Sequence, residues 1–116
     1  MVNIDSSDPA RLARFYAEAF GWEVTYSDAD YGMVEGDGLR IGFGRIEGFR
    51  PAQWPDESAT KRFHLDLRVD DLDDATERLC ALGASRPEFQ PGADRWRVLL
   101  DPDGQPFCLS PRPAAS

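Results

Sequence analysis

The chain has 116 residues, which is enough for one domain with a hydrophobic core and too few for two independent ones. Hydrophobic residues make up 41% of it and charged residues 29%, a balance typical of a globular domain and not of a disordered chain. The formal net charge of −8 repels nucleic-acid phosphates and anionic lipids, so we expect neither as a partner.

The first residues show no basic segment followed by an apolar one, and no apolar run is long enough to cross a bilayer, so a cytoplasmic location is the default expectation. The sequence has two cysteines, Cys80 and Cys108, which lack both CxxC spacing and the density of a secreted disulfide scaffold. We expect both to be reduced thiols.

The first half begins with an alternating segment that predicts a strand over residues 2–6. A helix is expected next, because Asp8 can cap its first turn, Pro9 suits its first position and Gly21 suits a left-handed stop. Its apolar residues recur at the spacing of one helix face. Three further strands are predicted over residues 22–27, 31–35 and 39–46.

The second half has the same order. A strand is predicted over residues 63–69, and a helix then begins at Asp71 and ends at Gly83. Three strands follow, over a weak segment at 85–89 and over 95–100 and 106–110, with a Gly-containing turn before the last strand, as in the first half.

The two halves therefore resemble one another as a tandem repeat, since Asp8 and Asp71 begin corresponding helices about half the chain apart. We predict an α+β fold of two tandem βαβββ modules in one domain over residues 1–116. Module one covers 1–46, a linker with Pro51 and Pro55 covers 47–61, and module two covers 62–116.

Several segments resemble the vicinal-oxygen-chelate superfamily, which includes glyoxalase I, bleomycin-resistance proteins, fosfomycin-resistance enzymes and extradiol dioxygenases. They are DPARLARFYAEAFGW at 8–22, HLDLRVDDL at 64–72, ALGA at 81–84 and DPDGQ at 101–105, while WPD at 54–56 resembles the glyoxalase-like branch. The resemblance implies a cupped, partly closed mixed β-sheet with the helices outside, a small-molecule site in the cup, and a homodimer.

In metal-dependent members of this superfamily, each module supplies one ligand from its first strand and one from its last. The resemblance places these positions at Met1, at Gly42 or Gly44, at His64 and at Cys108. Only His64 keeps the expected residue type, and an ion such as Mg²⁺ or Mn²⁺ needs several carboxylate or imidazole donors. We therefore predict a degenerate metal site and neither a metal nor another cofactor.

A zinc site is the alternative that these positions leave open. His64 and Cys108 could begin one, with Asp5, Asp66 or water as the remaining ligands. Cys108 is otherwise expected to be a small apolar filler rather than a nucleophile, because His64 is the one basic partner implied beside it.

Strand alternation predicts which side chains face the site. His64 is the candidate catalytic residue, as a general base or hydrogen-bond donor, or else an inherited ligand position now bonded to Asp5 or Asp66. Gly42 and Gly44 either bend their strand or leave space for a flat ligand. The candidate ligand-binding residues are Asp5, Arg40, Trp54, Asp66, Arg68 and Cys108.

Three of these candidates have a second interpretation. Arg40 and Arg68 could clamp a substrate carboxylate or pair with Asp5 or Asp66, and Trp54 could wall the site or pack the linker onto the body. Trp22 and Trp96 are expected in the core or at a subunit contact.

The leading functional hypothesis is a binding protein that sequesters an aromatic or peptide-like metabolite or antibiotic without a metal. The alternative is an isomerase, lyase or dioxygenase of the same superfamily that uses His64 as base or metal ligand. A module that binds a protein partner through its acidic surface is a third hypothesis.

Overall fold

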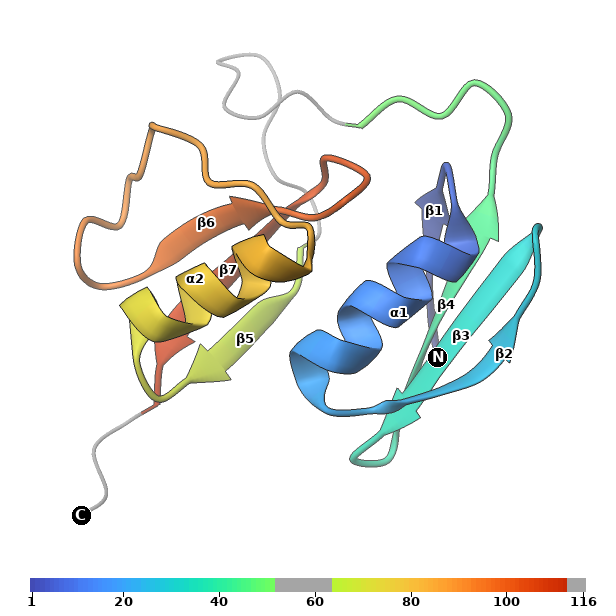
Figure 1. The fold of residues 1–116 in the computed structure, drawn as a ribbon, viewed down its shortest axis with the longest axis horizontal. Helices are drawn as coiled ribbons and strands as arrows, with labels where there is room; N and C mark the ends of the chain where they lie inside the picture. Colours follow the sequence, from blue (N-terminus) through green and yellow to red (C-terminus); the bar gives the residue numbers. More distant parts are fainter. Residues whose placement is uncertain (52–63, 113–116) are drawn as a thin grey trace. The chain divides into compact units, whose positions relative to one another are not determined.

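A computed structural model describes residues 1–51 and 64–112 and divides the chain into two compact units, Met1–Pro51 and Ala52–Ser116 (Figure 1). The first unit contains β1 (Val2–Ser6), α1 (Pro9–Phe20), β2 (Glu23–Ser27), β3 (Tyr31–Gly36) and β4 (Leu39–Arg45). The second contains β5 (Asp66–Val69), α2 (Leu72–Leu82), β6 (Arg97–Leu100) and β7 (Pro106–Pro111).

The α+β fold class is confirmed, and the described strands form two mixed sheets that do not close into a barrel. The first sheet has the order β1-β4-β3-β2, with β1 parallel to β4 and the other neighbours antiparallel. The second has the order β5-β7-β6, with β5 parallel to β7 and β6 antiparallel to it. None of the helices in the described part is long and apolar enough to cross a membrane.

Both helices begin and end where the sequence predicts, because their capping residues act locally. Asp8 accepts a hydrogen bond from the backbone N–H of Arg11 at 3.2 Å, and Asp71 accepts one from that of Asp74 at 2.9 Å. Gly21 ends α1 with a φ of 74°. Each helix thereby starts directly after the strand that precedes it.

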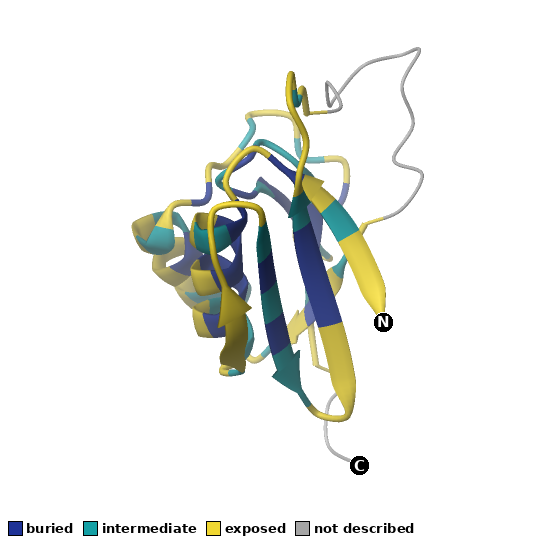
Figure 2. Cartoon of the chain, turned by 90° about the vertical axis from the view of Figure 1, so that its right-hand side faces the viewer, coloured by how far each residue is buried: buried dark blue, intermediate teal, exposed yellow. Residues whose placement is uncertain are grey.

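The core of the first unit lies between α1 and one face of its sheet. Tyr16 of α1 stacks on Phe43 of β4 with ring centroids 5.5 Å apart, and Val34 of β3 is fully buried beside them. Figure 2 shows that burial concentrates in the helix and in the middle strands, while β2 is exposed along its length. Residues of β3 and β4 that face away from α1 are therefore free to form a second surface.

The core of the second unit lies between α2 and one face of the second sheet. Leu67, Leu99, Phe107 and Leu109 alternate along the three strands and are buried under Leu79 of α2. Burial of such side chains stabilises the unit by about 1.5–3 kcal/mol each. The intervening residues of the same strands face the opposite side, where the candidate site lies.

The predicted strand over 85–89 is wrong, since only Ser85 pairs with β6, through an isolated bridge to Leu100. Continuing that antiparallel register would place Pro87 opposite Val98, and proline has no N–H to donate to the ladder. The side-chain amide of Gln90 replaces the missing strand. Its Oε1 accepts from the Val98 N–H, and its Nε2 donates to the carbonyls of Val98 and Pro87, each at 2.9 Å.

The DPDGQ turn holds β7 beside β6. Asp101 is 4% exposed, and its Oδ1 accepts hydrogen bonds from the backbone N–H groups of Asp103 at 2.9 Å and Gln105 at 3.0 Å. Gly104 adopts a φ of 84°, which residues with a Cβ rarely reach. This turn sets the register in which β7 presents Cys108.

Candidate functional site

The open face of the second sheet carries the site residues that alternation predicts. Asp66 of β5 lies opposite Cys108 of β7, and Arg68 lies opposite Ser110, so these four side chains share the face away from α2. Leu67, between Asp66 and Arg68, is buried on the other face. The predicted orientation of Asp66, Arg68 and Cys108 is thus the one that the structure has.

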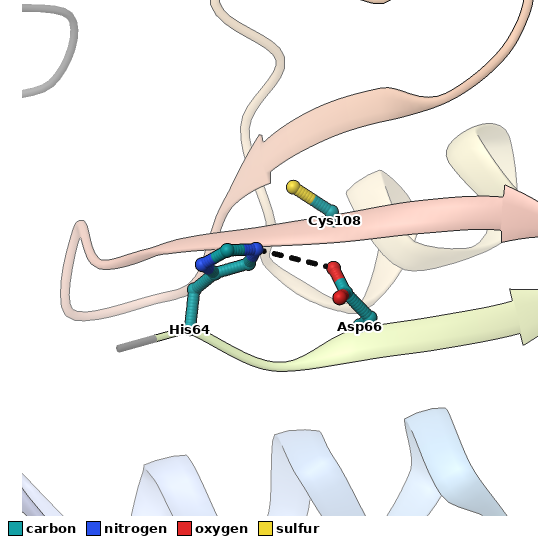
Figure 3. Close-up of side chains that lie close together, drawn as sticks. All are labelled: His64, Asp66 and Cys108. Atoms are coloured by element: carbon teal, nitrogen blue, oxygen red, sulfur yellow. Dashed lines mark ion pairs between the residues drawn. The ribbon is translucent and has the colours of Figure 1, made fainter. Parts of the chain in front are cut away.

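His64 lies just before β5 and contacts Asp66. Its Nε2 atom lies 3.2 Å from Oδ1 of Asp66, and one donor atom from each of His64, Asp66 and Cys108 lies within 4.8 Å of the other two (Figure 3). The His64 side chain is 29% exposed and that of Asp66 is 61% exposed, whereas Cys108 is buried. Of Asp5 and Asp66, the two partners expected for His64, the structure describes a contact with Asp66.

A pocket of about 380 Å³ lies over this cluster. The residues that line it come from β5 and the segment just before it, from β7, and from the segment just before β6. They are His64, Asp66, Arg95, Trp96, Cys108 and Ser110. A cavity of this size is within the range of small-molecule sites.

Arg95 and Trp96 are functional candidates that sequence reasoning missed. Trp96, expected in the core or at a subunit contact, is half-buried and lines the pocket, with the Arg95 guanidinium 5.3 Å from its ring centroid. The indole lies so close to Gly92 that a Cβ there would overlap it. Alternation back from Val98, which lies opposite Cys108, would have placed Trp96 on the pocket face.

The pocket has a mixed charge. Arg95 lines it together with one carboxylate, that of Asp66, and with the His64 imidazole. Arg68 follows Asp66 on the same face, and among the described residues it has no carboxylate partner. The chain as a whole has a net charge of −8, but on this face two arginines lie beside one carboxylate, and this local positive charge favours an anionic or electron-rich ligand.

In the first unit, Asp5 lies opposite Gly44 on the face of the sheet away from α1. Arg40, on the same face, forms an ion pair with Glu35 of the neighbouring strand and not with Asp5. The structure thus describes Asp5 and Arg40 within the first unit, and the His64 cluster within the second. Trp54, the remaining candidate, lies outside the described residues.

The space above Gly42 is occupied. The Tyr31 hydroxyl donates to Oδ1 of Asn3 at 2.8 Å, and this pair crosses β4 at Gly42, where a Cβ would overlap both side chains. Gly44, by contrast, has open space where its Cβ would lie. Gly42 therefore accommodates two side chains of its own sheet.

The residues at the positions that the resemblance assigns to metal ligands do not fit an oxygen-preferring divalent ion. In the first unit these residues are Met1, whose thioether is exposed, and either Gly42, beneath the Tyr31–Asn3 pair, or Gly44. In the second unit the donors are one imidazole, one carboxylate and one thiol, and a thiol suits Zn²⁺ or Cu⁺ rather than Mg²⁺ or Mn²⁺.

A second pocket, of about 430 Å³, lies in the first unit at the end of β4, and none of the predicted site residues lines it. It is lined by Ser7, Arg45, Ile46, Glu47, Gly48 and Phe49. Although this pocket is slightly larger, it brings together no imidazole, thiol or acid–base pair in contact. The His64 pocket is therefore the better candidate for a functional site.

Comparison with known proteins assigns the family. Residues 1–110 match the model of the glyoxalase-like domain family, so the chain belongs to that family. A search of the curated proteins finds no match.

Solved structures agree with this assignment. A glyoxalase/bleomycin resistance protein/dioxygenase family enzyme from Burkholderia phytofirmans PsJN is 24% identical with a TM-score of 0.67, over 95% of this chain and 94% of that one. The bleomycin resistance determinant encoded on transposon Tn5 is 26% identical with a TM-score of 0.56, over 96% and 94%. A bleomycin-binding protein solved in complex with bleomycin is 25% identical with a TM-score of 0.58, over 97% of both chains.

Proposed function

We propose that the protein binds a small molecule in the His64 pocket without a metal ion, and that it sequesters an aromatic or peptide-like metabolite or antibiotic. The observation that carries this proposal is the pocket itself, which joins an indole, a guanidinium, an imidazole and a hydroxyl on one sheet face. Sites of this kind bind ligands through an apolar surface and a few polar groups that set orientation.

The comparisons support the class of ligand. A protein of 25% identity, aligned over 97% of both chains, was solved in complex with bleomycin. In this chain, Trp96 and Arg95 offer a flat cationic wall to an aromatic ligand, and His64 and Ser110 offer hydrogen bonds. Among the described residues, the candidate ligand positions do not bring together the several oxygen donors that an ion such as Mg²⁺ needs, and this supports binding without such an ion.

We propose Asp66, Arg68 and Cys108 as further ligand contacts, since they share this face. Asp5 and Arg40, on the open face of the first sheet, and Trp54 in the linker are proposed contacts of the same ligand. These roles require the two units to act as one domain over residues 1–116, with modules 1–46 and 62–116 joined by the linker at 47–61.

Ligand binding is tested by thermal-shift screening against aromatic natural products and peptide antibiotics in buffer that contains a chelator. Bound ligands should raise the unfolding temperature of the wild type, since binding to the native state alone stabilises it. Trp96→Ala should abolish the shift, whereas Arg86→Ala, an exposed arginine outside the pocket, should keep it. A broad library without hits, together with metal-dependent turnover, contradicts the proposal.

An enzyme of the same superfamily, an isomerase, lyase or dioxygenase, is the second candidate function. The contact between His64 and Asp66 favours it, because a carboxylate that orients an imidazole is a common arrangement for a general base. Elemental analysis of protein purified without chelator separates the two candidates. Stoichiometric metal that is lost in His64→Ala would replace the binding proposal with a metal enzyme.

Two properties expected from the sequence complete the proposal. We propose a homodimer, which multi-angle light scattering of the full chain tests directly. We also propose a cytoplasmic location, and fractionation of expressing cells tests that.

A further inference from the structure

We propose that the His64 pocket selects ligands that carry a carboxylate beside an aromatic ring, and that the guanidinium of Arg95 binds this carboxylate. This inference rests on the proposed function for the pocket as a ligand site, and it names the chemical class of the ligand. Arg40 and Arg68 are the sequence candidates for such a contact, yet of the three arginines Arg95 is the one that lines the pocket.

The first observation is that the protein does not already use the charge of Arg95. None of the ion pairs among the described residues includes it, and its guanidinium lies 5.3 Å from the centroid of the Trp96 ring. A guanidinium held over an aromatic ring interacts through its charge and keeps N–H donors for another partner. The carboxylate that lines the pocket, that of Asp66, is in contact with His64 instead. Arg95 therefore has donors to offer a ligand.

The second observation is that the loop before β6 holds Trp96 in place. The indole packs on Gly92, which is buried, so closely that a Cβ there would overlap the ring. The backbone N–H of Arg95 donates to the carbonyl of Gly92 at 2.9 Å, and that of Ala93 donates to the carbonyl of Gln90 at 3.3 Å. Ala93 has a φ of 51°, a conformation that residues with a Cβ adopt at an energetic cost. The indole and the backbone of Arg95 are thus positioned before a ligand binds, which lowers the cost of ordering them.

An aromatic carboxylate matches these groups. A flat ring can pack against the indole of Trp96, while the two carboxylate oxygens accept a pair of hydrogen bonds from the planar guanidinium of Arg95. Ser110 adds a hydroxyl donor to the same lining. Aromatic acids and peptides that end in an aromatic residue share this chemistry, since both carry a carboxylate near a ring.

The charges around the pocket favour one negative charge on the ligand. The net charge of −8 repels anions, but salt screens that repulsion beyond about 8 Å, whereas a contact with Arg95 is made within the pocket. Arg68 lies opposite Ser110 and, among the described residues, has no carboxylate partner, so it adds positive charge on this face. Asp66 opposes a second negative charge, which disfavours a phosphate monoester relative to a carboxylate.

Isothermal titration calorimetry of the full chain with matched acids and amides tests the inference. One pair is 2-naphthoate and 2-naphthamide, and the other, which represents a peptide end, is N-acetyltryptophan and its amide. In neutral buffer with a chelator, we expect an acid to bind about 10-fold or more tightly than its amide, because hydrogen bonds between charged groups are the stronger ones. The pair with the larger ratio identifies the source of the carboxylate.

Arg95→Gln should remove this preference. We expect the acid to bind about 10-fold more weakly than to the wild type, while the dissociation constant of the amide changes by less than about 3-fold. Arg86→Ala, an exposed arginine outside the pocket, should keep the wild-type ratio of acid to amide. This ratio reports the charge contact itself, because a disturbed Trp96 would weaken both members of a pair. Circular dichroism confirms that each variant is folded.

Several results would overturn the inference. They are equal binding of acid and amide in both pairs, tighter binding of 2-naphthyl phosphate than of 2-naphthoate, an unchanged ratio in folded Arg95→Gln, and absence of binding by every one of these compounds. The proposed function fails separately, when the broad library gives no hits. Neutral or cationic hits that depend on Trp96 leave the proposed function standing and remove this inference alone.

Discussion

Replacement of Gln90 by alanine should destabilise the second unit, because this side chain completes the edge of β6. Three hydrogen bonds are lost, two of them with the backbone of Val98, a residue that is fully buried. An unsatisfied buried backbone group costs about 1–3 kcal/mol, and water reaching the half-buried Gln90 position offsets part of this. We expect a loss of about 2–4 kcal/mol in the free energy of unfolding.

The assay is urea unfolding combined with hydrogen exchange of the Val98 amide, which should lose protection by about 10-fold or more in Gln90→Ala, since each 1.4 kcal/mol is a factor of ten. Gln90→Glu should be no better than alanine, because it keeps the acceptor for the Val98 N–H but turns a carboxylate toward the Val98 and Pro87 carbonyls. Glu88→Ala, an exposed change in the same loop, is the matched control. Equal stability of Gln90→Ala and Glu88→Ala, within about 0.5 kcal/mol, refutes the reasoning.

Three further predictions concern single side chains. Arg97→Ala should cost about 2–4 kcal/mol in urea unfolding, because it removes both the packing of the buried stem and the hydrogen bonds of Nη1 to Asp73 and Thr76. Arg97→Met should cost less, under about 1.5 kcal/mol, because methionine keeps the stem's volume and removes an Nε that is buried without a partner. Gly42→Ala should cost about 1–3 kcal/mol by the same assay and Gly44→Ala under about 1, because a Cβ overlaps neighbours only at the first; equal costs would contradict this. The Tyr26 hydroxyl and backbone N–H groups lower the pKa of Asp28 below its ordinary 3.8, so the resulting stability is present above that value and lost as pH falls through the native pKa. Tyr26→Phe should raise that pKa in an NMR titration.

The parts of the fold that sequence predicts are those decided by neighbouring residues. Asp8 and Asp71 each accept a hydrogen bond from the amide three residues ahead, and Gly21 ends its helix by its own backbone conformation. The strand predicted over 85–89 failed for a reason that also lies in the sequence, a proline at a paired position. The effect of this proline can be recognised only when the register with β6 is known. The hydrogen bond from the Val98 N–H to the Gln90 side chain could not be predicted, because no strand or helix periodicity relates these two residues.

The same distinction applies to the candidate positions in each of the two units. Asp66 and Cys108 could be placed on one face because side-chain direction alternates along each strand. The occupation of the space above Gly42 could not be predicted, because it depends on which side chains of the neighbouring strands pack over this position. Tyr31 and Asn3, which are joined by a hydrogen bond, cover Gly42, and this glycine has no side chain that could act as a metal ligand. At the superfamily's metal positions, the first unit therefore offers an aromatic and amide surface, and the described ionisable chemistry lies with His64, Asp66 and Cys108 in the second. Ligand binding in which that cluster supplies the ionisable groups of the second unit is the function that this difference supports.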